Sequence, residues 1–298
     1  MTQREKGFLL LTSQLGNPLR KPMTVAQFRV LANRVRNMEI PVSDRELTAE
    51  DITAMGYALP IAASIVELLA ETELLEYYLK KGQACGCMPI TRVSEGYPAA
   101  VRRKLGDDCP GVLWSKGDVD ILRNPRVALV GSRDLREENH RFAREVGRQA
   151  AIQGYTLVSG NARGADVTAQ EACLEMGGTV ISVVADKLKN HPCRDRVLYL
   201  SEDGYDVPFS SPRAHSRNRI IHSLCPKTFV APVTARKGGT WQGTTKNLRH
   251  GWSSVYCFED GSEASRLLVQ QGSVPVSIPE LNNIEKLTGG CVNFLDKI

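Results

Sequence analysis

The sequence predicts an α/β protein, with a Rossmann-like, doubly wound, mostly parallel sheet and a small N-terminal all-helical domain. Two short apolar runs, residues 127–130 and 155–158, each lead into a glycine-containing polar loop and then a helical pattern. Such runs are typical of strands buried on both faces. The strand–helix alternation continues to residue 184, whereas the first 88 residues carry only helix signals. A parallel sheet joined by crossover helices accounts for this order.

The first helix signal comes early in the chain. Thr24 and Gln27 have the spacing of a capping box, and Phe28, Leu31 and Val35 after them fall on one helical face. We therefore expect an amphipathic helix that begins just after Thr24.

Two further helices are expected before residue 88. Thr48 opens a short one, and Pro60 suits the first turn of a longer one that ends at residues 80–82. The apolar stripe of the longer helix consists of Ile65, Leu68, Leu69 and Leu75. We interpret this unit as a packing or protein-contact module, with DNA-backbone binding as the alternative. Residues 82–96 are interpreted as a linker.

The central alternation gives the sheet its order. A helix that carries Phe142, Val146 and Ala150 at four-residue spacing is expected to stop at Gly154, which can adopt the left-handed conformation. In chain order, the prediction is strand 127–130, helix to Gly154, strand 155–158, helix 166–176 and strand 179–184. Loops that follow parallel strands meet at one edge of the sheet, where such folds bind ligands.

Two motifs lie at that expected edge, Gly131-Ser132-Arg133 and residues 159–166, which read Ser-Gly-Asn-Ala-Arg-Gly-Ala-Asp. Glycine lets a phosphate approach backbone amides, and amides at a helix N-terminus attract anions. Arginine offers phosphate a planar fork of donors. We expect Asp166 to cap its own helix or to fix Arg163. These residue types favour phosphate binding over covalent catalysis.

The two motifs resemble those of the DNA-processing protein A (DprA/Smf) family, which belongs to a wider set of nucleotide-binding Rossmann-like domains. Residues 127–184 follow the family order of strand, Gly-Ser-Arg, helix, strand and Ser-Gly-x-Ala-Arg-Gly-x-Asp. The later family element Arg-Asn-Arg-Ile-Ile is present at residues 217–221. Tyr97-Pro98 and residues 112–117 are similar to the family lead-in. The resemblance covers roughly residues 95–260.

The resemblance implies a non-enzymatic role without cofactors. Members of the family bind single-stranded DNA and pass it to a RecA-type recombinase, chiefly during natural transformation (competence). They also self-associate through the Rossmann-like domain, so a homodimer is expected.

The chain departs from the family pattern in several places, which indicates a divergent member. The usual Ser-Gly-Ser-Leu-Ile-Thr-Ala loop is replaced by residues 236–244, where Thr240 and Trp241 stand for the apolar pair. The acid often found after the preceding strand is absent, because Pro232 follows residues 228–231. The family Tyr-Pro is only echoed by His191-Pro192. We expect no C-terminal winged-helix module.

Charge patterning supports a polyanion site independently of the resemblance. Residues 207–258 contain no Asp or Glu, although the whole chain has a net charge of only +5. The basic residues of this stretch are Arg213, Arg217, Arg219, Lys227, Arg236, Lys237, Lys246 and Arg249. A single-sign segment inside a folded domain is the footprint expected of a nucleic-acid site.

Aromatic side chains can add base stacking to such a site. The candidates are Phe209, Phe229, Trp241 and Trp252. We expect Phe229 and Trp252 to be ordinary core residues. Trp241, which falls in a glycine-rich segment expected to be a loop, is the favoured DNA contact.

The expected DNA- and phosphate-binding set combines both motifs with the basic segment. It consists of Gly131, Ser132, Arg133, Ser159, Gly160, Arg163, Gly164, Asp166, Arg217, Asn218, Arg219, Lys237, Gly238, Gly239 and Lys246. The expected divisions are an N-terminal helical domain (1–88), a Rossmann-like domain (89–277) and a C-terminal tail (278–298).

The eight cysteines are scattered and are interpreted as reduced structural thiols. Cys85-Gly86-Cys87 is the single close pair, and a zinc site would usually need Cys-x-x-Cys spacing and a second pair. No metal is expected. The sequence contains no apolar window long enough for a membrane helix and no signal peptide, which favours a cytoplasmic protein.

A second function class stays open: a nucleotide-sensing protein that acts in phage defence, or as the antitoxin of a cognate nucleotide-modifying toxin. The segment Gly238-Gly239-Thr240 is similar to the start of the Pro-Gly-Gly-x-Gly-Thr-x-x-Glu loop of lysine-decarboxylase-like phosphoribohydrolases. General acid–base chemistry needs a carboxylate within hydrogen-bond reach, and none lies near this segment in the sequence. We therefore do not expect hydrolysis.

Overall fold

A computed structural model describes residues 1–37 and 46–289. The described chain forms one sheet of nine strands in the order β1-β2-β6-β5-β4-β3-β7-β8-β9. Pairing is parallel from β6 through β9, whereas β1 and β2 add an antiparallel edge. This is the mostly parallel α/β architecture that the sequence predicts.

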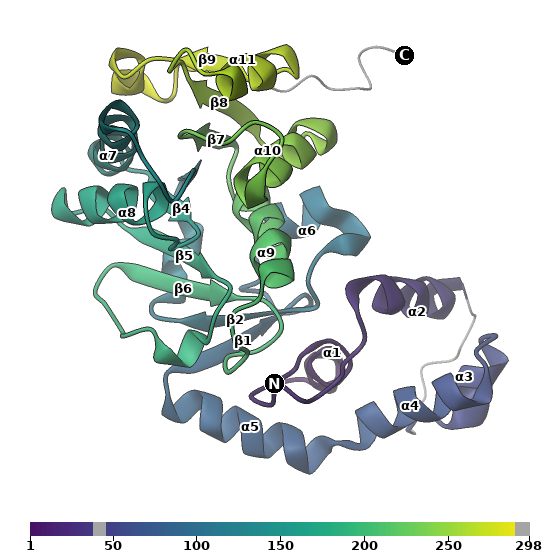
Figure 1. Ribbon diagram of the computed structural model, residues 1–298. Helices are drawn as coiled ribbons and strands as arrows, with labels where there is room; N and C mark the ends of the chain where they lie inside the picture. Colours follow the sequence, from purple (N-terminus) through teal and green to yellow (C-terminus); the bar gives the residue numbers. More distant parts are fainter. Residues whose placement is uncertain (38–45, 290–298) are drawn as a thin grey trace.

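The strands are β1 (Cys87–Thr91), β2 (Val112–Lys116), β3 (Arg126–Val130), β4 (Thr156–Ser159), β5 (Val180–Val184), β6 (Val197–Ser201), β7 (Lys227–Val230), β8 (Ser254–Phe258) and β9 (Val274–Val276). The helices are α1 (Gln3–Thr12), α2 (Val25–Asn37), α3 (Ala49–Ala54), α4 (Leu59–Ala70), α5 (Thr72–Ala84), α6 (Ala99–Leu105), α7 (Glu137–Ile152), α8 (Ala165–Glu175), α9 (Ser211–Leu224), α10 (Gly238–His250) and α11 (Glu263–Gln270). Figure 1 shows their arrangement.

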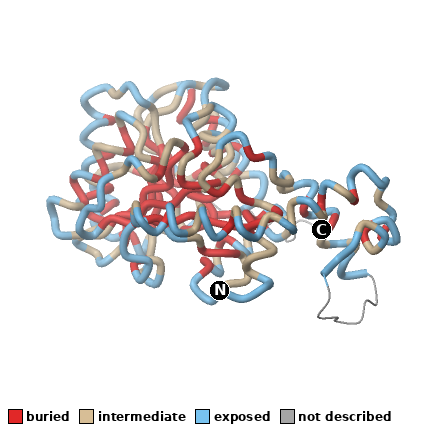
Figure 2. Tube along the Cα trace, turned by 90° about the horizontal axis from the view of Figure 1, so that it is seen from below, coloured by how far each residue is buried: buried red, intermediate tan, exposed pale blue. Residues whose placement is uncertain are grey.

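The predicted central alternation is confirmed as β3, α7, β4, α8 and β5. Gly154 has a φ of +75°, and the Tyr155 amide donates to the Ala150 carbonyl oxygen at 2.8 Å, so the chain turns out of α7 as expected. Phe142, Val146 and Ala150 are fully buried. Helices cover both faces of the sheet, and the buried residues concentrate around it (Figure 2).

The N-terminal helices largely follow the sequence signals. The capping boxes of Thr24 with Gln27 and of Thr48 with Asp51 are both present. The long helix expected from Pro60 is instead two helices, α4 and α5, with a break at Glu71. Gly82 lies inside α5 because the helix packs closely here: a Cβ would sit 3.1 Å from the Trp114 ring.

The N-terminal helices share a core with the sheet. Leu9, Leu15 and Leu75 are fully buried in the same apolar cluster as Trp114 of β2. The linker interpretation of residues 82–96 is wrong, because this segment contains β1, which hydrogen-bonds to β2. The division at residue 88 stays a prediction.

The described part of the expected C-terminal tail packs on α7. Leu281 and Ile284 are fully buried. Gln153 Nε2 donates to the Leu281 carbonyl oxygen at 2.8 Å, and its Oε1 accepts from the Ile284 amide at 2.7 Å. Across residues 1–37 and 46–289, no helix is both long and apolar enough to cross a bilayer.

The strand order sets the place of a binding site. From β3 the chain winds outward through β4, β5 and β6, then crosses back and adds β7, β8 and β9 on the other side of β3. The strand order therefore reverses between β3 and β7. In doubly wound sheets, ligands bind beyond the carboxyl ends of the strands at such a switch point.

Candidate nucleic-acid interface

The turn after β3 is locked against the start of α8. A Cβ on Gly131 would lie 2.5 Å from the Ala165 Cβ, so only glycine fits there. Gly164 has a φ of +90°, and a Cβ on it would lie 2.5 Å from the Ser132 carbonyl oxygen. The Ala165 amide donates to that same oxygen at 3.1 Å. These glycines bring the two sequence motifs into contact.

Asp166 organises the loop after β4. Its Oδ2 accepts from the amides of Gly160 at 3.1 Å and Ala162 at 3.2 Å. Asp166 therefore fixes the loop before its helix instead of holding Arg163. Arg163 is exposed and forms an ion pair with Asp134 at 3.1 Å. Burial raises the pKa of the Asp166 carboxyl.

The side chain of Arg217, from α9, lies beside the loop after β4. Its residue surface is 9% exposed, and Nη1 donates to the Val183 carbonyl oxygen at 2.7 Å. Gly160 is required beside it, because a Cβ there would overlap the guanidinium group at 1.5 Å. Burial lowers the pKa of Arg217, and the neighbouring positive charge of Arg133 lowers it further. Among the described residues, its buried Nε has no hydrogen-bond partner.

The N-terminus of α10 packs against the turn after β3 and against α9. Thr240 Oγ1 donates to the Gly131 carbonyl oxygen at 2.9 Å, and Asn218 Nδ2 donates to the Gly239 carbonyl oxygen at 3.0 Å. The first-turn amides of a helix have no partner within the helix, so this end carries partial positive charge. Lys237, just before α10, adds a full charge.

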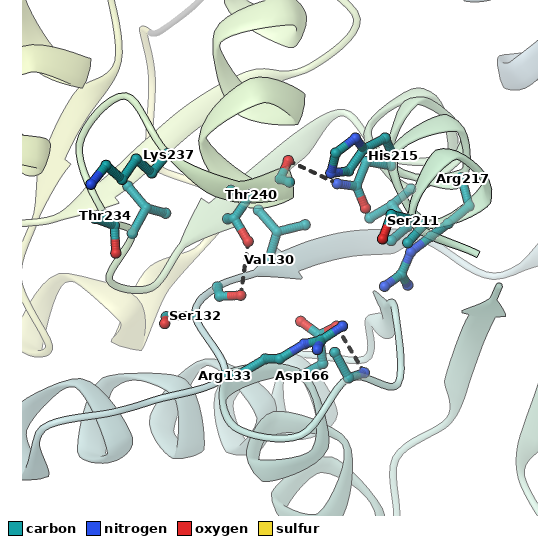
Figure 3. A pocket seen from close by; sticks show the side chains of 18 of the residues that line it. Val130, Ser132, Arg133, Asp166, Ser211, His215, Arg217, Thr234, Lys237 and Thr240 are labelled. Atoms are coloured by element: carbon teal, nitrogen blue, oxygen red, sulfur yellow. Dashed lines mark hydrogen bonds between the residues drawn. The ribbon is translucent and has the colours of Figure 1, made fainter. Parts of the chain in front are cut away.

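The turn after β3, α9 and the start of α10 line a cavity of about 360 Å³ at the switch point. Figure 3 shows Arg133 and Arg217 approaching the region of Asp166 from opposite walls, with His215 and Thr240 above. The polar lining consists of Ser132, Arg133, Asp134, Asp166, Ser211, His215, Arg217, Asn218, Thr234, Lys237 and Thr240. A second cavity of about 320 Å³ shares Arg133, Ala162, Phe209 and Arg217 with it.

The structure brings most of the expected residues together. The first cavity is lined by Gly131, Ser132, Arg133, Asp166, Arg217, Asn218, Lys237, Gly238 and Gly239, and the second also by Gly160 and Arg163. Gly164 shapes the turn behind them. Ser159 is fully buried and its Oγ accepts from Gln170 Nε2 at 2.5 Å, so it faces the core instead of a cavity.

Two expected cationic contacts lie elsewhere. Arg219 is two residues beyond Arg217 on α9 and therefore points away from it. It forms an ion pair with the partly buried Glu202, and its Nη1 donates to the Asp108 carbonyl oxygen at 2.6 Å. Lys246 is exposed on α10 outside both cavities, with its Nζ 5.9 Å from the centre of the Trp252 ring.

The prediction that Trp241 contacts DNA is wrong, because the glycine-rich segment expected to be a loop is the first turn of α10. Trp241 is 9% exposed and packs in the core. Phe229 and Trp252 are core residues, as expected. Phe209 is 52% exposed and lines both cavities.

Sequence reasoning missed Ser211 and His215, which line the first cavity together with Asn218. Their spacing of four and three residues is that of one helical face. This spacing is visible in the sequence, but it indicates a shared face only if residues 211–224 are known to form a helix. It also missed Asp134, which folding brings to the cavity that holds Gly238 and Gly239.

No group of three or more His, Cys, Asp or Glu side chains suited to a metal ion occurs within residues 1–37 and 46–289. The seven cysteines in this part of the chain are free thiols. Cys291 lies outside the described residues.

The fold and site define a class: a Rossmann-like α/β protein with a basic cavity at the switch point of its sheet. Residues 88–273 match the family model described as DNA recombination-mediator protein A, and the chain belongs to this family.

Curated relatives agree with this assignment. The chain is 30% identical over 210 residues to protein Smf of Escherichia coli. The aligned region covers 64% of this chain and 55% of that protein. It is 32% identical over 186 residues to DNA processing protein DprA of Streptococcus pneumoniae, and this alignment covers 56% of this chain and 63% of that protein. The chain thus spans less than two thirds of the length of these relatives.

Solved structures show the same fold. The structure of DprA from Streptococcus pneumoniae matches with a TM-score of 0.72 at 23% identity and covers 97% of this chain and 99% of that one. The DNA processing protein A of Helicobacter pylori, described as having a single-stranded DNA binding mode, matches with a TM-score of 0.55 at 20% identity. That match covers 66% of this chain and 94% of the other.

Proposed function

We propose that this protein binds single-stranded DNA and holds backbone phosphates in the cavity at the switch point. The observation that carries the proposal is Arg217, a buried guanidinium group in the cavity wall whose Nε has no partner among the described residues. Burial disfavours the charged form of this guanidinium group, and an anion in the cavity would stabilise its positive charge.

The charges around the cavity favour a phosphate. Arg133 and Lys237 are exposed on its lining, and the start of α10 adds its first-turn amides. The two acids of the same lining are already engaged. Asp166 accepts two backbone amides, and Asp134 pairs with Arg163. The net field presented to a ligand is therefore positive.

Phe209 supplies the feature that distinguishes a nucleic acid from a free anion. Its ring is half exposed at the boundary between the two cavities. Stacking of a base on such a ring contributes roughly 1–3 kcal/mol and tolerates any base. We assign it the contact that sequence reasoning gave to Trp241.

The proposal is for binding without chemistry on the DNA. The two acids of the lining have structural partners: Asp166 accepts from two backbone amides, and Asp134 forms an exposed ion pair with Arg163. Membership in a recombination-mediator family supports a further role in delivering the strand to a RecA-type recombinase. We propose that the protein acts in the cytoplasm. We also propose that it forms a homodimer, as the family resemblance implies.

A ligand comparison tests the proposal. Fluorescence anisotropy would compare a labelled oligothymidylate of about 20 nucleotides with a duplex of equal length. We expect tighter binding of the single strand. The slope of log affinity against log salt should be about −0.7 per phosphate neutralised.

Competition with unlabelled mononucleotides separates the two function classes. A nucleotide sensor would release the labelled strand at low mononucleotide concentration. Displacement only by other single strands is the expected result. Duplex binding as tight as single-strand binding would contradict the proposal.

A further inference from the structure

The second cavity differs from the first in its chemistry. It lies beyond the carboxyl end of β5 and contains the loops after β4 and β5. Its cations are less available than their number implies, because Arg163 is paired with Asp134 and Arg217 Nη1 already donates to the Val183 carbonyl oxygen. The lining also includes Asp186, whose negative charge acts on Arg217 and opposes the lowering of its pKa by burial.

Asp186 is a fixed carboxylate. It follows β5 by two residues, and its Oδ1 lies 2.7 Å from His191 Nε2. His191 is itself held by stacking on Tyr199, with ring centres 4.9 Å apart. The hydrogen bond from His191 lowers the pKa of Asp186, so the group is an anion at neutral pH. Its side chain is still 50% exposed.

A fixed anion at this place has a consequence for the ligand. A phosphate would be repelled by Asp186, whereas an N–H donor would be attracted. In a nucleotide whose phosphate occupies the first cavity, the part that carries N–H donors is the base. Phe209 lies on both cavities and can stack the base that enters the second.

We propose that the second cavity is a nucleobase subsite in which Asp186 accepts a hydrogen bond from an exocyclic amino group, so that cytosine, adenine and guanine are favoured over thymine. This inference rests on the proposed function. Carboxylates accept from the cytosine N4 amino group in protein–DNA complexes, whereas thymine presents a carbonyl oxygen at the equivalent position.

Oligodeoxycytidylate and oligothymidylate provide the test, because their bases are of similar size and differ at this position. With the whole protein, we expect oligodeoxycytidylate to bind roughly fivefold to tenfold tighter. In Asp186→Asn the ratio should fall toward one while oligothymidylate affinity is kept or increased. Asp186→Ser removes the same carboxylate and should give the same loss. Asp120→Asn, which removes an exposed acid paired with Arg123 outside both cavities, is the matched control and should keep the wild-type ratio.

Each other outcome has a definite meaning. Equal binding of the two homopolymers by the wild-type protein overturns the base subsite and leaves the proposed function standing. Failure to bind either homopolymer overturns the proposed function itself. If oligoribouridylate binds tighter than oligodeoxyuridylate and Asp186→Asn abolishes that difference, Asp186 contacts a ribose hydroxyl and the assignment to the base is overturned.

Discussion

The double variant Arg133→Ala with Lys237→Ala should bind single-stranded DNA about 30- to 100-fold more weakly than wild type. Both side chains are exposed on the first cavity, so their loss removes phosphate contacts without opening the core. If each holds one phosphate, the salt slope should become shallower by about 1.4. Anisotropy titrations at several salt concentrations measure both quantities.

The matched control changes the net charge by the same amount but removes cations that lie outside the two cavities. Arg141→Ala with Lys286→Ala removes two exposed cations outside both cavities. This variant should bind within about twofold of wild type, because charges beyond a Debye length of about 8–10 Å are largely screened. Equal losses in the two double variants would mean that only the overall charge matters and would contradict a localised site.

Arg217→Ala should lower the free energy of unfolding by about 1–3 kcal/mol, because it removes a buried guanidinium group that hydrogen-bonds the Val183 carbonyl oxygen and attracts the Asp166 carboxylate. Asp166 would then keep its two amide hydrogen bonds but lose the attraction of Arg217, the largest of the effects that favour its charged form. Urea unfolding at neutral pH measures the change. Arg144→Ala breaks an exposed ion pair with Glu175 and is the control, for which a change below about 1 kcal/mol is expected.

The Arg217→Ala deficit should depend on pH in a defined direction. Burial already raises the pKa of Asp166, and loss of the attraction from Arg217 raises it further. A carboxyl with a raised pKa binds protons more strongly in the folded state. Its destabilising effect is therefore complete above the folded-state pKa and shrinks as the pH falls through that value. The difference in free energy of unfolding between variant and wild type should therefore narrow as the pH falls from neutral into the acid range. A constant difference, or one below about 1 kcal/mol at neutral pH, would contradict this role of Arg217.

Local patterns were sufficient to predict the central sheet. The apolar runs before Gly131 and Gly160 mark strands buried on both faces, and the four-residue spacing from Phe142 to Ala150 marks the helix between them. The positions of Arg133 and Asp166 follow from this alternation alone. Parallel strands end at one edge, so residues after them converge without further information.

The rest of the site depends on contacts between distant segments. Arg217 and Arg219 are both arginines of one motif, but only the packing of α9 on the sheet puts one at the cavity and the other on Glu202. The prediction for Trp241 is wrong because three glycines within residues 238–243 favour a loop locally, whereas the close approach of α9 requires two of them inside a helix. Packing between helices, not local propensity, decides that segment.

Photo-crosslinking tests the central claim most directly. A single strand with 5-bromodeoxyuridine at several positions would be crosslinked to the protein, digested and mapped by mass spectrometry. We predict adducts on the peptide that contains Phe209, with a yield that falls in the Arg133→Ala, Lys237→Ala double variant. Adducts confined to the N-terminal helices or to α11, with none at the ends of β3, β4 and α10, would show that the DNA binds elsewhere.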